Sequence, residues 1–229
     1  MKAALFSALA LLTAFASAQQ TAIRIVLVGD STVAEGGGWG PGLRAAFQPG
    51  VDVLNHARNG RSSKSFLDEG AWAPALDAKP RYVVIQFGHN DCPGKGPERE
   101  TDPATTYRAH LTRYLNETRA AGAQPILATS IVRRNFQPDG RIQPDCLVPF
   151  VEQVRLLAAE VGVPLLDLYE LTRQQAEALG PDASDRLGPL TPDGKPDRTH
   201  LSPQGQAAVG AIVARELVRV RPELKRLLQ

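Results

Sequence analysis

Five short apolar runs, separated by segments with helical patterns, constrain the fold of this chain more than any other feature. Each run is apolar almost throughout, as in strands that are buried on both faces of a sheet. Strands that alternate with helices predict a parallel sheet with helices on both sides. The predicted strands are Ile23 to Val28, Val51 to Asn55, Tyr82 to Phe87, Pro125 to Thr129 and Val163 to Leu168.

Helix signals are clearest in three of the intervening segments. Each has an apolar stripe at helical spacing and a residue suited to its start or its end. The Gly- and Pro-rich stretch from Gly180 to Pro196 carries no such pattern and predicts one long loop inside the domain. The predicted helices run from Asp102-Pro103 to Gly122, from Leu147 to Val161 before Gly162, and from Ser202-Pro203 onward.

The first 18 residues have the pattern of a secretory signal peptide. Lys2 precedes an apolar run from Ala3 to Ala16, and Ala16-Ser17-Ala18 predicts cleavage after Ala18. An uncleaved membrane anchor is the alternative. Residues 19–229 then form a single domain, which we expect to be secreted or periplasmic, monomeric, and without stable membrane insertion after the signal is removed.

Charge and cysteine content narrow the classes of partner and site. The chain has 26 Lys and Arg against 24 Asp and Glu, so a nucleic-acid partner is not expected.

In an oxidising compartment Cys92 and Cys146 are a candidate disulfide, which would stabilise the fold by roughly 4 kcal/mol in the chain-entropy model. Two separate buried thiols are the competing interpretation.

The spacing of the glycines and histidines does not match the known cofactor-binding and metal-binding motifs. The glycines from Gly36 to Gly42 do not complete a dinucleotide-binding fingerprint, and Gly94-Lys95 does not complete a P-loop. Turn formation and close packing explain the glycine cluster better. The four histidines form no zinc motif. We therefore expect no cofactor and no metal, although a carboxylate-only calcium site stays open.

Nucleophilic catalysis fits the residues that follow the predicted strands. Ser31 comes directly after the first strand in Gly29-Asp30-Ser31-Thr32, where glycine permits a sharp turn. Asp197 precedes His200 by three positions, a spacing that can bring a carboxylate to the imidazole Nδ1 and leave Nε2 to accept the serine proton. Each part has a simpler explanation, because serines after strands are often N-caps and Asp and His are common on surface turns.

Two further loops hold candidate donors for an oxyanion. Gly60 lies in the loop after the second strand, and Asn90 lies in Gly88-His89-Asn90-Asp91 after the third. With the backbone N–H of Ser31, these groups would make three donors, each worth on the order of 3 kcal/mol in a transition state. Taken singly, Gly60 and Asn90 are typical turn residues. Together with Ser31, Asp197 and His200 they favour nucleophilic catalysis over five unrelated turn residues.

These four blocks, in this order, resemble the SGNH or GDSL-type hydrolase family across essentially the whole of residues 19–229. Within the family, Thr32, the stretch from Asn59 to Phe66 and the Gly88 to Asp91 block look most like rhamnogalacturonan acetylesterases. The resemblance implies a flavodoxin-like three-layer α/β/α sandwich with sheet order 2-1-3-4-5. It also implies a secreted esterase without a cofactor, which removes O-acetyl groups from polysaccharide.

The resemblance also assigns roles to the site residues. It makes Ser31 the nucleophile, His200 the general base and acid, and Asp197 the carboxylate that orients His200. Ser31 N–H, Gly60 N–H and the Asn90 amide become the oxyanion donors. The reaction would pass through an acyl-serine that water, activated by His200, then hydrolyses.

Substrate contacts are expected on a basic rim, which would suit an acidic sugar such as galacturonate. We expect His89, Arg61 and Arg134 to contact substrate, and solvated surface charge is the competing explanation. Three alternatives stay open: a lysophospholipase or a thioesterase, which would need an apolar acyl groove, and an exported glycan-binding protein without turnover. The cationic rim candidates are Arg58, Arg61, Lys64, Arg133 and Arg134.

Overall fold

The computed structural model describes residues 23–229, and the predicted signal peptide at residues 1–18 lies outside them. The core of the fold is a five-stranded sheet with the order β2-β1-β3-β4-β5, in which every neighbouring pair is parallel. This confirms the predicted 2-1-3-4-5 order. The strands are β1 (Ile23–Gly29), β2 (Val51–Asn55), β3 (Tyr82–Gln86), β4 (Gln124–Ala128) and β5 (Leu165–Leu166).

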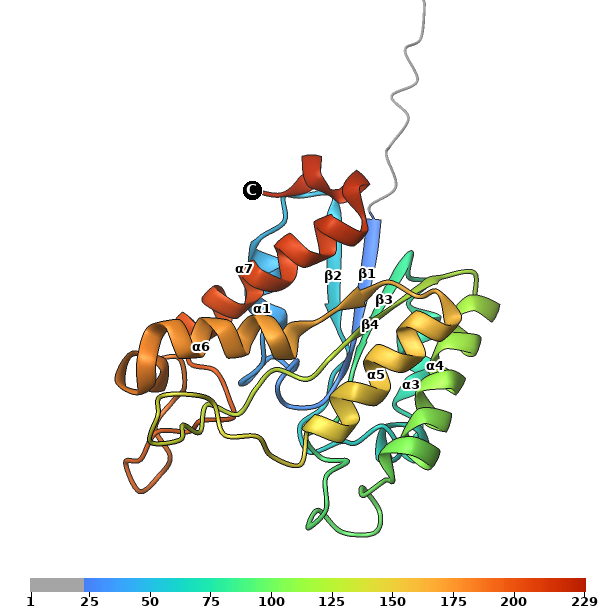
Figure 1. The fold of residues 1–229 in the computed structure, drawn as a ribbon. Helices are drawn as coiled ribbons and strands as arrows, with labels where there is room; N and C mark the ends of the chain where they lie inside the picture. The colour runs from blue at the N-terminus through green and yellow to red at the C-terminus, as the bar shows by residue number, and fades with distance from the viewer. Residues whose placement is uncertain (1–22) are drawn as a thin grey trace, which may run out of the picture.

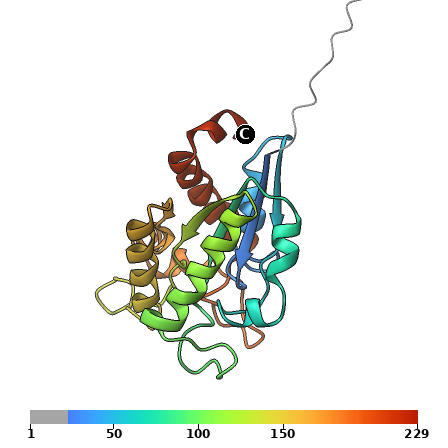
Figure 2. The same ribbon diagram turned by 90° about the vertical axis from the view of Figure 1, so that its right-hand side faces the viewer.

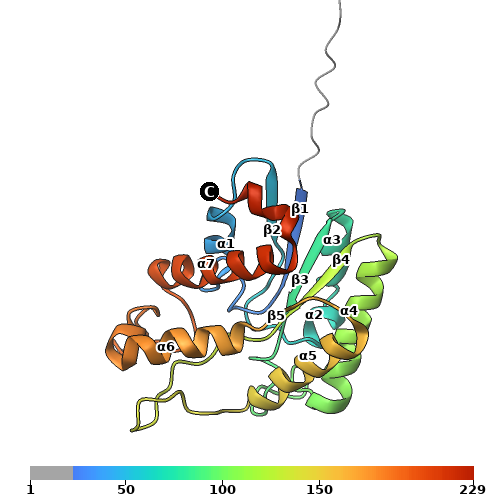
Figure 3. The same ribbon diagram turned by 45° about the horizontal axis from the view of Figure 1, so that its top comes forward.

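Helices cover both faces of the sheet, which makes the predicted three-layer α/β/α sandwich (Figure 1). Figure 3 separates the two helical layers and shows β5 at the edge of the sheet beside β4. One layer holds α1 (Gly40–Ala45), α6 (Leu168–Asp185) and α7 (Pro203–Val220). The other holds α3 (Trp72–Asp77), α4 (Arg108–Ala120) and α5 (Val148–Val161).

Alternation along the central strands gives each layer its own apolar core. In β1, Val26 and Val28 face the α3, α4 and α5 side, whereas Ile25 and Leu27 face the α1 and α7 side. All four side chains are 0% exposed. A strand buried on both faces needs apolar residues at every position, because its successive side chains point to opposite sides. The continuous apolar runs in the sequence follow from this requirement.

Predicted helix ends agree closely with the structure. The Asp102 carboxylate accepts a hydrogen bond from the Thr105 N–H at 2.9 Å, as expected of an N-cap. The first turn after it, Pro103–Tyr107, is a π-helical turn that leads into α4. α5 ends at Gly162, which has a φ of 64°, and Ser202 caps α7 by accepting from the Gly205 N–H.

Two expectations about elements need correction. The fifth strand, expected from Val163 to Leu168, pairs with β4 only at Leu165–Leu166, because Pro164 has no N–H to donate and Leu168 already begins α6. The stretch from Gly180 to Pro196 is not one loop, since α6 continues through a kink at Gly180 as far as Asp185. Pro181 suits the first position of the turn that restarts there.

Several short elements had no clear signal in the sequence. The loop after β3 projects beyond the edge at which the strands end, as both Figure 1 and Figure 2 show. α1, α3 and α6 were also not predicted. The remaining elements are α2 (Ser65–Asp68) and a 3₁₀ helix, η2 (Pro222–Leu227).

Candidate active site

Ser31 lies at the carboxyl end of β1, where the chain turns away from the sheet. A Cβ on Gly29 would come within 2.4 Å of the Gln86 carbonyl oxygen, so this position requires glycine. The Asp30 carboxylate accepts hydrogen bonds from the Thr32 N–H at 2.8 Å and the Thr32 hydroxyl at 2.7 Å, which fix the turn. Burial raises the pKa of Asp30. Ser31 itself stays partly exposed.

His200 and Asp197 form a hydrogen-bonded chain that ends on Ser31. His200 Nε2 lies 2.9 Å from Ser31 Oγ, and His200 Nδ1 lies 2.7 Å from Asp197 Oδ2. The other oxygen, Asp197 Oδ1, accepts from the N–H groups of Thr199 at 2.8 Å and His200 at 3.0 Å. The carboxylate therefore holds both the ring and the backbone of the turn that carries it.

The protonation state of Asp197 suits this arrangement. Burial raises the pKa of the carboxyl group, but hydrogen bonds from the N–H and the ring of His200 and from the Thr199 N–H outweigh that effect and lower it. An ionised Asp197 accepts a hydrogen bond from the Nδ1–H of a neutral imidazole. His200 Nε2 is then free to accept a hydrogen bond, and later a proton, from Ser31.

A cleft of about 580 Å³ opens over this chain of residues. It brings together groups from the loops after β1, β2 and β3 and from the loop before α7, as expected when parallel strands end at one edge. All six residues expected at the catalytic and oxyanion positions or beside them line it: Ser31, Gly60, His89, Asn90, Asp197 and His200.

Gly60 and Asn90 are held next to each other by their loops. The Asn90 side-chain amide donates to the Arg61 carbonyl oxygen at 3.1 Å, which joins the loop after β3 to the loop after β2. Gly60 has a φ of 76°, the left-handed conformation that favours glycine. The structure thus places both predicted oxyanion donors on the wall of the cleft that also holds Ser31.

His89 lies deeper than a simple rim residue. Its side chain is 3% exposed, and Nε2 lies 3.1 Å from the Ile131 carbonyl oxygen, to which it donates. Burial, together with the nearby charge of Arg133, lowers the pKa of His89 well below its ordinary value. The ring is therefore neutral, and it supports the floor of the cleft more than it reaches into it.

Three of the expected rim cations do not line the cleft, and for two of them other contacts explain why. Arg61 forms an ion pair with Glu69 at 2.8 Å, and the Lys64 ammonium donates to the Pro97 carbonyl oxygen at 2.8 Å. Arg58 is exposed but lies outside the cleft lining. Among the expected cations only Arg133 lines it.

Arg134 was expected on the rim, and the structure places it underneath the catalytic turn instead. It is 3% exposed, and one guanidinium nitrogen, Nη2, donates to the carbonyl oxygens of both Asp197 and His200 at 2.7 Å. Its own N–H donates to the Arg198 carbonyl oxygen at 2.8 Å. Burial lowers the pKa of Arg134 to about 10, so it stays charged at neutral pH. Its contacts are with the turn itself and leave no face for substrate.

Two residues near the site were missed in the sequence. Lys95 lines the cleft from the loop after β3. Asp91 is buried and accepts from the Ser63 N–H at 3.1 Å and the Ser63 hydroxyl at 2.5 Å. Burial raises the pKa of Asp91 to about 7. Their place in the loop that follows β3, where Asn90 also lies, was the available signal, but the sequence did not show the direction of either side chain.

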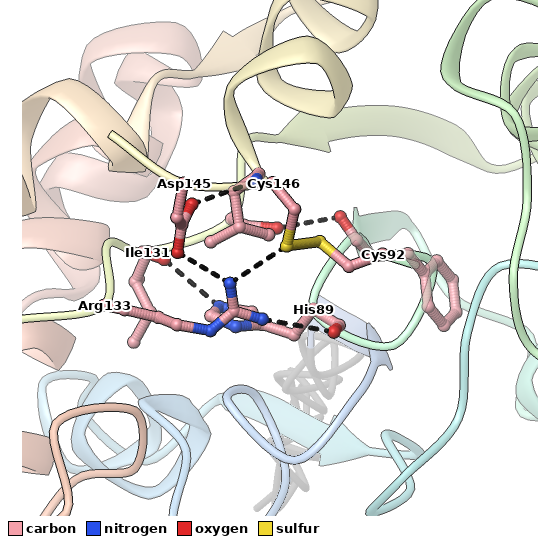
Figure 4. The surroundings of a disulfide bond; sticks show 9 residues. His89, Cys92, Ile131, Arg133, Asp145 and Cys146 are labelled. Carbon is pink, nitrogen blue, oxygen red and sulfur yellow. Dashed lines mark hydrogen bonds and ion pairs between the residues drawn. A yellow bond between two sulfur atoms is a disulfide. The ribbon is translucent and has the colours of Figure 1, made fainter. Parts of the chain in front are cut away.

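Cys92 and Cys146 form a disulfide with their Cα atoms 5.8 Å apart, beside Arg133 and His89 (Figure 4). Arg133 lies against the bond, with one nitrogen 3.3 Å from Cys146 Sγ and 2.6 Å from Asp145. The same guanidinium donates to the His89 carbonyl oxygen at 3.3 Å. The crosslink therefore joins the Asn90 loop to the segment that precedes α5.

Residues 23–229 contain neither a cluster suited to a metal ion nor a membrane-spanning helix. No group of three or more His, Cys, Asp and Glu side chains in this range is arranged to hold a metal ion. Within the same part of the chain, no helix has the length and apolar character needed to cross a membrane.

Comparison with known proteins agrees with the geometry. Residues 27–208 match the model of the GDSL-like Lipase/Acylhydrolase family. Rhamnogalacturonan acetylesterase RhgT of Bacillus subtilis is 36% identical over 220 residues, which are 89% of this chain and 93% of the relative. A rhamnogalacturonan acetylesterase of Emericella nidulans is 31% identical over 209 residues, 81% of this chain and 80% of the relative.

A solved structure supports the same fold. The Bacillus subtilis protein YXIM superposes with a TM-score of 0.74 at 25% identity. The match covers 87% of this chain and 57% of that chain, so the present sequence spans little more than half of that protein.

Proposed function

The chain belongs to the GDSL-like Lipase/Acylhydrolase family and is a carboxylic ester hydrolase, and from this premise we propose that it removes acetyl groups from acetylated rhamnogalacturonan. The observation that carries the proposal is the chain of hydrogen bonds from Asp197 through His200 to Ser31, at 2.7 and 2.9 Å, inside a cleft large enough for part of a polysaccharide.

The reaction follows from the positions of these groups. His200 Nε2 takes the proton of Ser31 Oγ as the oxygen attacks the carbonyl carbon of the ester. The N–H groups of Ser31 and Gly60 and the Asn90 amide stabilise the negative oxygen that forms. The intermediate then collapses, His200 gives its proton to the sugar oxygen, and the acetyl group stays on Ser31.

Hydrolysis of the acetyl-serine repeats these steps with water as the nucleophile. His200 takes a proton from water, which attacks the acetyl-serine and forms a second oxyanion in the same three-donor site. Collapse of this intermediate releases acetate and returns the proton to Ser31. Asp197 keeps Nδ1 protonated throughout, so Nε2 is the nitrogen that exchanges protons.

The lining of the cleft supports an acetylated sugar over a long acyl chain. Apart from Pro189, every residue of the lining is a glycine or has a polar or charged side chain. A lysophospholipase or thioesterase needs an apolar groove for its acyl chain. An acetyl group needs very little apolar surface. The acetylesterase relatives support the same preference.

Export is part of the proposal. Lys2, the apolar run that follows it and Ala16-Ser17-Ala18 support a cleaved signal peptide, and an enzyme acting on a polymer such as pectin must work outside the cytoplasm. N-terminal sequencing of the protein recovered from its host should begin at Gln19. A chain that begins at Met1 would overturn the cleavage.

The test is a substrate panel: acetylated rhamnogalacturonan, acetylated xylan and a long-chain p-nitrophenyl ester. We expect acetate release with the highest kcat/KM on rhamnogalacturonan. Preference for the long-chain ester would keep the ester hydrolase and reject the polysaccharide. Binding of the glycan with no acetate release would favour a glycan-binding protein instead.

A further inference from the structure

Two positively charged side chains line the cleft, and only one of them has a carboxylate partner. Arg133 and Lys95 both line it, and they act in the same direction on His89, whose pKa their charges help to lower. The single carboxylate in the lining, Asp197, is hydrogen-bonded to His200. The cleft therefore holds more positive than negative charge.

Arg133 already has a partner. Its guanidinium lies 2.6 Å from Asp145, and the two side chains are only 17% and 23% exposed, so the pair is well shielded from water. Figure 4 shows this guanidinium held between Asp145, the Cys146 sulfur and the His89 carbonyl oxygen. These contacts use both terminal nitrogens of the guanidinium, and Asp145 compensates its charge.

Lys95 is different, because within the described residues 23–229 it forms no ion pair. It is partly buried and faces the same cleft as Ser31 and His200. A cation that lacks a carboxylate partner inside a binding cleft is available to one carried by a ligand.

The loop that carries Lys95 is fixed before any ligand arrives. Its two ends are joined where the Thr101 N–H donates to the Asp91 carbonyl oxygen at 3.1 Å, and Cys92 anchors one end through the disulfide. Inside the loop the Gly96 N–H donates to Glu100 at 2.7 Å. A residue presented from an ordered loop loses less entropy on binding.

We propose that Lys95 binds the carboxylate of a uronic acid residue and so positions an acidic polysaccharide with its acetyl ester at Ser31. This inference rests on the proposed function and specifies the sugar chemistry that the site selects. An ammonium on the cleft wall and a carboxylate on the sugar chain form a charge-assisted hydrogen bond, which a neutral glycan such as xylan cannot offer. The pairing is partly exposed to solvent, so it weakens as salt is added.

The experiment removes the Lys95 ammonium and the substrate carboxylates, separately and together. Wild type, Lys95→Gln and Lys225→Gln are compared on an acetylated rhamnogalacturonan oligosaccharide and on the same oligosaccharide with its carboxyl groups methyl-esterified. Lys225 is exposed on η2 and lies outside the lining of the cleft, so it is the matched loss of one positive charge. The readout is kcat/KM for acetate release at low and high salt.

The wild type and Lys225→Gln should prefer the free acid over the methyl ester by about tenfold at low salt, as a charged hydrogen bond predicts. Lys95→Gln should lose that preference. If Lys95→Gln lowers kcat/KM by the same factor on both substrates, Lys95 does not recognise the carboxylate and the inference is wrong, while the acetylesterase proposal stands.

A binding arm separates this result from failure of the proposed function. If wild type releases no acetate from either oligosaccharide, the acetylesterase proposal fails by itself. Calorimetry with Ser31→Ala and with Ser31→Ala/Lys95→Gln then measures binding of the deacetylated oligosaccharide, acidic and methyl-esterified. A Kd about tenfold lower for the acid in the first protein and equal in the second supports Lys95 as the anchor. Equal affinities in both proteins overturn it.

Discussion

His200 Nε2 lies 2.9 Å from Ser31 Oγ, although 169 positions separate the two residues in the chain. The loop after β1 and the loop before α7 meet directly, because the Leu201 N–H donates to the Gly37 carbonyl oxygen at 2.8 Å. Behind them α1 packs closely on α7, and a Cβ on Gly42 would fall 1.8 Å from the carbonyl oxygen of Gln206. Gly38, Gly40 and Gly42 thus serve close packing, as expected from the sequence.

Gly60→Ala tests the oxyanion loop. The φ of Gly60 is 76° and no atom lies within 4 Å of where its Cβ would be, so alanine meets strain and not a clash. We expect about 1 kcal/mol of destabilisation and at least a tenfold fall in kcat, because the loop relaxes and moves its N–H from the oxyanion.

The control for this change is Gly122→Ala, at a φ of 74° with equally open space, just beyond the C-terminal end of α4 and outside the lining of the cleft. It should lose similar stability in a denaturant titration and keep its kcat. Equal losses of kcat in the two variants would remove Gly60 from the oxyanion site.

Arg134→Met tests the buried cation beneath the catalytic turn. It leaves the carbonyl oxygens of Asp197 and His200 without their donor, which costs about 1–3 kcal/mol of stability. We expect kcat to fall about tenfold or more, since small displacements of a base slow proton transfer. KM should change little because Arg134 is buried.

Arg134→Lys should recover part of the lost kcat, because an ammonium can donate to one of the two carbonyl groups. Arg155→Met, which breaks a half-exposed ion pair with Asp167 away from the cleft, is the control. A large rise in KM with kcat intact in Arg134→Met would return Arg134 to the substrate-binding role expected from the sequence.

Burial of Asp91 makes the stability of the folded protein depend on pH. Burial raises its pKa from 3.8 to about 7 in the folded protein, so between these values the folded state holds a proton that the unfolded chain has lost. The stability contributed by this proton is complete below about pH 4 and disappears as the pH rises through about 7, by about 4 kcal/mol at most.

Asp91→Asn should abolish this part of the pH dependence. The difference in unfolding free energy between wild type and Asp91→Asn, measured from pH 4.5 to pH 8, should shift against wild type as the pH rises. Asp182→Asn, at an exposed position on α6, is the control and should give a flat difference. A flat profile for Asp91→Asn would show that Asp91 is ionised across the range.

The Cys92–Cys146 bond ties the Asn90 loop to the segment before α5. Replacing both cysteines with alanine should cost about 2–5 kcal/mol of stability. It should lower kcat only a few-fold, because Asn90 keeps its hydrogen bond to Arg61. Dithiothreitol should lower the Tm of wild type and leave that of the double variant unchanged; an equal shift in both would argue against the crosslink.

The sequence predicted the sheet and the meeting of Ser31, Asp197 and His200 because both depend on strong local signals. Apolar runs mark buried strands, and parallel strands bring their following loops to one edge. It failed at Arg134, which looked like surface charge, and at Lys95, because the direction of a long side chain depends on packing between distant segments. It missed the helical end of α6 because Gly180 and Pro181 are typical of loops as well as of helix kinks.

The most direct test of the central claim is acetate release from acetylated rhamnogalacturonan by wild type and Ser31→Ala measured side by side. We expect that wild type releases acetate, and that Ser31→Ala is slower by at least about 10³-fold with a nearly unchanged Tm. If Ser31→Ala keeps the turnover of wild type, Ser31 is not the nucleophile and the proposed mechanism is wrong.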